Sequence, residues 1–193
     1  MATIRQGNRG VLIIVDVQVG VMRNSWHVPQ IIENIRTAVD KARRLGVPVI
    51  WVQHSDNDLV IDSADWQLVP ELVPTNNETR IQKHFNSSFE QTTLEEILAH
   101  LGATRIILAG AQTNWCIRAT AYGALERGYD LTLIQDAHTT ETMELENGVR
   151  IEAETIIREL NIAMKWLAYP GRKNDTALAG NIDFSLAGNP HLS

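Results

Sequence analysis

Short apolar runs rich in β-branched residues recur along the chain, and this pattern limits the possible folds more than any other feature. Continuous runs of this kind are typical of strands that are covered on both faces of a parallel sheet. Four are clear, at residues 10–16, 47–53, 105–110 and 130–135. Weaker candidates at residues 79–83 and 161–166 bring the expected number of strands to about six.

Segments with helical periodicity separate these runs. Apolar residues recur every three or four positions between 31 and 45, where Gly46 and then Pro48 end the pattern. Thr92 and Thr93 stand three residues before two glutamates, the spacing of a capping box. Further helices are therefore expected at residues 94–101, 114–127 and 146–160. Alternation of strands and helices implies right-handed crossovers and a three-layer α/β/α sandwich around a mostly parallel sheet.

The length of 193 residues, of which 44% are hydrophobic, suits one globular domain with a full core. We expect this domain to cover residues 1–170. The Gly- and Asn-rich stretch 171–193 is expected to be an arm or a disordered end, and residues 55–78 an irregular loop.

The charge of the chain argues against a nucleic-acid partner. It has 17 Lys and Arg against 23 Asp and Glu, a formal charge of −6, with no basic cluster that would follow a phosphate backbone. No stretch approaches the roughly 20 apolar residues of a membrane span, and the first residues lack the apolar centre of a secretory signal. We therefore expect a cytoplasmic protein with a small-molecule partner.

Cys116 is the single cysteine of the chain. One cysteine cannot form an internal disulfide or a Cys-based zinc site. It is therefore either a small core residue or a nucleophile, and the thiolate is the nucleophilic form.

The predicted strands bring Cys116 near two other reactive side chains. Asp16 ends the first strand, Lys83 ends a weaker one, and Cys116 lies in the turn after the strand at 105–110. In an open α/β sheet, ligands bind beyond the carboxyl ends of the strands, so all three belong to one rim. A helix N-terminus and the Lys83 ammonium would favour the thiolate, and Asp16 would act as general base. Taken singly, a core cysteine, a capping Asp and a solvated Lys remain alternatives.

Three segments together resemble the isochorismatase-like cysteine hydrolases, namely VDVQ at 15–18, KHFNSSF at 83–89 and LAGAQTNWC at 108–116. The similarity extends over about residues 10–162. It implies a Rossmann-like sheet and an Asp-Lys-Cys triad of Asp16, Lys83 and Cys116. It also implies a cis peptide between Ala111 and Gln112, an oxyanion hole formed by the amides of Gln112 and Cys116, and no cofactor. Homodimers or homotetramers are common in the family. In such an assembly the tail at residues 171–193 could exchange between subunits.

The resemblance leaves the reaction open. Relatives hydrolyse amide and ureido C–N bonds through a thioester, whereas isochorismatase cleaves a vinyl ether. We favour C–N hydrolysis. The alternatives are a vinyl-ether hydrolase and a catalytically silent relative that binds a small ligand or a protein, for which slow alkylation of Cys116 would be evidence.

Nicotinamidases of this superfamily bind a metal through an Asp-x-His pair and a further His. Here the corresponding residues read His54-Ser55-Asp56, with the ligand types exchanged, and no histidine occurs between His54 and His84. Two ligands are too few for a stable shell. We expect no metal and assign His54 to the wall of the pocket.

Several aromatic and polar residues beside these motifs are candidates for substrate contacts. We predict that the pocket includes Gln18, Trp26, Phe85 and Trp115. Trp51 and Trp166 are assigned to the core, and His138, after a predicted strand, to a capping or loop role.

Overall fold

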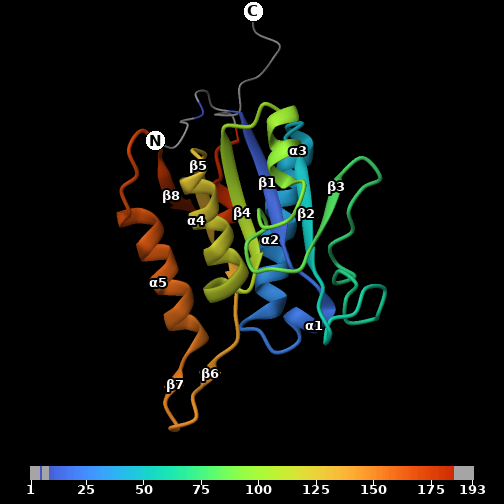
Figure 1. The fold of residues 1–193 in the computed structure, drawn as a ribbon, viewed down its shortest axis with the longest axis vertical. Coiled ribbons are helices and arrows are strands. Elements are labelled where there is room, and N and C mark those ends of the chain that lie inside the picture. The colour runs from blue at the N-terminus through green and yellow to red at the C-terminus, as the bar shows by residue number, and fades with distance from the viewer. Residues whose placement is uncertain (1–4, 6–8, 185–193) are drawn as a thin grey trace, which may run out of the picture.

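In the computed structural model, which describes residue 5 and residues 9–184, six parallel strands form one central sheet (Figure 1). Their spatial order is β3-β2-β1-β4-β5-β8. This order places β1 and β4 at the centre, where their apolar sequences are covered on both faces. The bounds are β1 (Gly10–Val15), β2 (Val49–His54), β3 (Thr79–Lys83), β4 (Arg105–Ala111), β5 (Asp130–Thr139) and β8 (Asn174–Ala177).

Helices cover both faces of the sheet and complete the predicted three-layer sandwich. On one face, α2 (Val28–Arg44) packs against Leu12 and Ile14 of β1. On the other, Val11, Ile13 and Val15 contact a second apolar cluster. This cluster includes residues of α3 (Leu94–His100), α4 (Arg118–Glu126) and α5 (Ala153–Trp166). The remaining short elements are α1 (Val19–Met22), the π-helical turn η1 (Thr113–Ile117) and the 3-10 turn η2 (Ala179–Asn181).

The clear strand predictions and the weak one at residues 79–83 are confirmed, but the prediction of a strand at 161–166 is wrong. Those residues form the end of α5, whose buried face continues from Leu160 to Met164. Trp166 was assigned to the core, yet 83% of it is exposed at the helix end. The helix expected at 146–160 is also displaced. It begins at Ala153, and an antiparallel pair, β6 (Met143–Glu144) and β7 (Arg150–Ile151), precedes it.

The sixth strand comes from the segment that was expected to be a tail. β8 pairs in parallel with β5, with Leu131 opposite Asn174. Ile182 and Phe184 are then buried in the cluster under α2. The described part of the predicted tail is thus packed on the domain, whereas residues 185–193 lie outside the described residues. β8 lies at the sheet edge, where a strand need not be apolar on both faces. Its polar sequence therefore carries no strand signal. As expected, residues 55–78 form an irregular loop.

Among the described helices, none combines the length and the apolar character required to cross a bilayer.

Candidate active site

Three side chains from separate segments meet at the carboxyl ends of the strands. Asp16 directly follows the central strand β1, Lys83 is the last residue of β3, and Cys116 lies in η1, just after β4. All three are buried, with exposures of 1% for Asp16, 1% for Lys83 and 8% for Cys116. The parallel topology therefore gathers the three residues that the sequence motifs single out.

Lys83 is the centre of this group. Its Nζ lies 2.7 Å from Oδ2 of Asp16, 3.2 Å from Sγ of Cys116 and 3.3 Å from Nδ1 of His54. An ammonium group has three N–H donors, and here each has an acceptor. Lys83 is thus held in one position between the carboxylate and the sulfur.

Burial changes the proton affinity of both Asp16 and Cys116. Loss of hydration raises the pKa of Asp16, and the opposing charge of Lys83 reduces this effect. Burial, together with the negative charge of Asp16, raises the pKa of Cys116 to about 12, against the influence of Lys83. In the unliganded site the sulfur therefore holds its proton, in contrast to the thiolate expected from the helix terminus and Lys83. A more basic Asp16 is better suited to accept that proton during attack.

The turn that carries Cys116 has an unusual backbone. The peptide bond between Ala111 and Gln112 is cis, at the position that the family resemblance implies. The chain then forms one π-helical turn, in which the Ile117 amide donates to the Gln112 carbonyl at 3.0 Å, and continues as α4. Cys116 thus lies in the first turn of a continuous helix. Amides near a helix start lack acceptors within the helix, which is compatible with the oxyanion hole predicted at Gln112 and Cys116.

Asp16 and Gly110, at the ends of the neighbouring strands β1 and β4, both have a positive backbone φ. Asp16 has φ 53°, a left-handed conformation that non-glycine residues rarely adopt. Gly110 in β4 has φ +124°, and a Cβ there would lie 2.0 Å from the carbonyl oxygen of Val15. The two strand ends can approach this closely only because position 110 lacks a side chain.

His54 links Lys83 to the edge of the site. Because Nδ1 accepts from Lys83, Nε2 carries the proton and donates to Oδ2 of Asp56 at 3.1 Å. The other Asp56 oxygen accepts from the amides of Asp58 and Leu59. Both ring nitrogens of His54 are therefore occupied by protein partners. In the described residues, no group of three or more His, Cys, Asp or Glu side chains is arranged to hold a metal ion.

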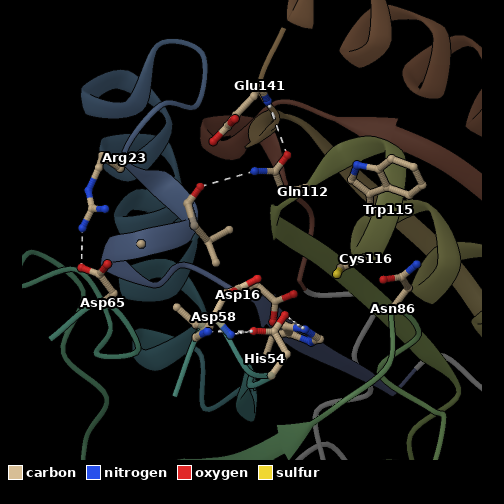
Figure 2. A pocket seen from close by; sticks show the side chains of 14 residues that line it. Asp16, Arg23, His54, Asp58, Asp65, Asn86, Gln112, Trp115, Cys116 and Glu141 are labelled. Atoms are coloured by element: carbon tan, nitrogen blue, oxygen red, sulfur yellow. Dashed lines mark hydrogen bonds and ion pairs between the residues drawn. The ribbon is translucent and has the colours of Figure 1, made fainter. Parts of the chain in front are cut away.

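A cavity of about 360 Å³ opens next to Cys116 (Figure 2). Two predicted substrate residues line it, His54 and Trp115, and half of Trp115 is exposed. Its lining also includes residues that the sequence analysis did not identify, namely Gly20, Val21, Arg23, Asp58, Leu59, Asp65, Asn86 and Glu141. Asn86 belongs to the recognised KHFNSSF segment and could have been proposed from it. The others come mainly from loops that carry no signal.

The other three predicted substrate residues do not line this cavity. Gln18 is fully buried, and its side-chain amide bonds both the carbonyl and the amide of His54. It thus positions the end of β2. Trp26 stacks on His27 with the ring centroids 3.7 Å apart, and Phe85 is exposed outside the cavity lining.

His138, which was expected in a capping or loop role, connects the turn that carries Cys116 to α5. Its Nδ1 lies 2.9 Å from Oγ1 of Thr113, and its Nε2 lies 3.1 Å from Oδ1 of Asn161. Burial lowers the pKa of His138 to about 4, so the ring is neutral at neutral pH. A neutral ring can accept from Thr113 and donate to Asn161, and this fixes the start of η1.

The chain is similar in sequence and in fold to known proteins. The family model of the isochorismatase domain matches residues 10–150. The chain belongs to the isochorismatase family of hydrolases. The region that matches the family model contains Asp16, Lys83 and Cys116. It ends before α5 and β8.

The similar proteins include a nicotinamidase and a streptothricin hydrolase. Nicotinamidase 3 of Arabidopsis thaliana is 27% identical over 151 residues, covering 69% of this chain and 75% of that protein. Streptothricin hydrolase of Streptomyces noursei is 28% identical over 144 residues, and the match spans 72% of this chain but only 57% of that enzyme. Among solved structures, a cysteine hydrolase from Pseudomonas syringae pv. phaseolicola has a TM-score of 0.79 over 92% of each chain at 19% identity, a likeness in fold.

Proposed function

We propose that this isochorismatase-family protein hydrolyses a C–N bond of a small amide or ureido compound, with Cys116 as nucleophile. The observation that carries the proposal is the position of Lys83, which bonds both Asp16 and Cys116 next to an open cavity. A nicotinamidase among the relatives supports amide chemistry.

The proposed reaction begins with transfer of the thiol proton to Asp16 while Sγ of Cys116 attacks the substrate carbonyl carbon. The amides of Gln112 and Cys116 stabilise the oxyanion. When the C–N bond breaks, Asp16 returns the proton to the departing nitrogen, and a thioester with Cys116 remains. Water then attacks the thioester carbonyl carbon and gives one proton to Asp16. The C–S bond breaks, the acid product leaves, and Asp16 returns the proton to the sulfur. Lys83 remains an ammonium throughout and orients the carboxylate.

Replacement of the nucleophile tests this proposal. Cys116→Ala should abolish release of ammonia or amine from amides that the unaltered protein hydrolyses. Circular dichroism should show that the variant keeps the fold. Mass spectrometry of the quenched reaction should show an acylated Cys116. Full turnover by Cys116→Ala would overturn the proposed role of the cysteine.

The family match itself favours one second candidate, hydrolysis of a vinyl ether, because the matching model describes an isochorismatase domain. Release of pyruvate from isochorismate, undiminished in Cys116→Ala, would favour this candidate over amide hydrolysis.

A further inference from the structure

The cavity beside Cys116 is lined by more negative than positive side chains. Arg23 is the only guanidinium among the described residues that line it. The carboxylates are those of Asp16, Asp56, Asp58, Asp65 and Glu141.

Some of these charges are already balanced or hydrogen bonded. Asp16 pairs with Lys83, and Asp65 pairs with Arg23. Asp56 accepts a hydrogen bond from the amide of Leu59, and this bond is the main reason that the pKa of Asp56 lies below its usual value. Asp56 therefore remains ionised at neutral pH.

Asp58 and Glu141 have no ion-pair partner in the part of the chain that the structure describes. Figure 2 shows Glu141 at the upper edge and Asp58 at the lower edge of the cavity. The amide of Glu141 lies 3.4 Å from Oε1 of Gln112, which places Glu141 beside the turn that carries Cys116. Two unpaired carboxylates thus reach the cavity from the loops after β2 and β5.

Among the described residues at the cavity, each cation already has a carboxylate partner. Arg23 forms an ion pair with Asp65, and the three N–H groups of buried Lys83 already have acceptors. In addition, Oδ1 of Asp16 is buried without a hydrogen-bond partner and belongs to a side chain that lines the cavity. The carboxylate oxygens that lack a partner can only accept hydrogen bonds, so they suit a ligand with many N–H donors. The half-exposed ring of Trp115 offers a face that attracts cations.

We infer that the substrate carries an amine or guanidinium group in addition to its scissile amide or ureido group, and that Glu141 and Asp58 bind this cation. The inference rests on the proposed function and specifies its substrate class. Compounds with a carboxylate should be rejected, because like charges would meet at the cavity mouth.

A matched series of para-substituted benzamides tests the inference. The cationic compound is para-(aminomethyl)benzamide, the neutral one para-methylbenzamide and the anionic one para-carboxybenzamide. Binding to Cys116→Ala, measured by calorimetry, should follow the order cationic, neutral, anionic. In the unaltered protein, kcat/KM for ammonia release should follow the same order, and the preference should weaken with added salt.

Variants of the two acids assign the preference to this cavity. Glu141→Gln and Asp58→Asn should each reduce the ratio of cationic to neutral affinity by about fivefold, the upper range for one partly exposed charge pair. Glu71→Gln, which removes an exposed carboxylate outside the cavity lining, should leave the ratio unchanged.

Binding and turnover separate the two proposals. Equal binding of all three compounds, or preference for the anionic one, overturns the charge inference even if amides are hydrolysed. Binding in the predicted order without any Cys116-dependent ammonia release supports the charge inference and contradicts the proposed function for these amides.

Discussion

At the scale of single residues, the surroundings of Cys116 favour the thiol over the thiolate. With a pKa raised to about 12 by burial and by Asp16, the free protein contains little thiolate at neutral pH. Alkylation by iodoacetamide should be slow at pH 7 and should accelerate by about tenfold per pH unit as the thiolate fraction rises. Rates measured by mass spectrometry from pH 6 to pH 10 would check this, and a plateau below pH 9 would contradict it. Slow labelling therefore does not by itself indicate a silent relative.

Lys83 leads to a second prediction at this scale. Lys83→Met should reduce kcat for an amide substrate by at least about 100-fold, because it removes the charge that orients Asp16 and bonds Cys116. Lys165→Met, at an exposed position on α5, serves as the control and should retain activity. Comparable activity of the two variants would exclude a role for Lys83 in the reaction.

At the scale of elements, the close approach of β1 and β4 determines the site. Gly110→Ala would place a Cβ against the carbonyl of Val15 at a φ of +124°, so β4 would have to shift away from the strand that ends at Asp16. We expect a loss of about 3 kcal/mol or more in the free energy of unfolding, measured by denaturant titration. Gly180→Ala meets no atom within 4 Å and should change stability little. Similar stabilities for both variants would disprove this packing requirement.

At the scale of the whole molecule, the domain extends beyond the predicted limit at residue 170. Ile182 is fully buried in the cluster under α2, so Ile182→Ala should lower the free energy of unfolding by about 3 kcal/mol. Leu178→Ala, at a residue that is 42% exposed, should have a smaller effect. Thermal unfolding would compare the two variants, and an unchanged midpoint for Ile182→Ala would show that this segment does not stabilise the domain.

The sequence by itself determined the features that have strong local signals. Continuous apolar runs identified the central strands because burial on both faces leaves no room for polar residues. The motifs around Asp16, Lys83 and Cys116 marked the candidate site because the ends of parallel strands share one rim.

Only the tertiary structure decided features that depend on contacts between distant segments. β8 is polar and became a strand because the edge of β5 supplied hydrogen-bond partners. Gln18 was expected to contact substrate, but its amide matches the backbone of His54, 36 residues away. The charge balance of the cavity depends on which acids obtain partners. Asp65 pairs with Arg23, whereas Glu141 forms no ion pair with any residue that the structure describes. Such pairings follow from positions in space, which local sequence patterns do not encode.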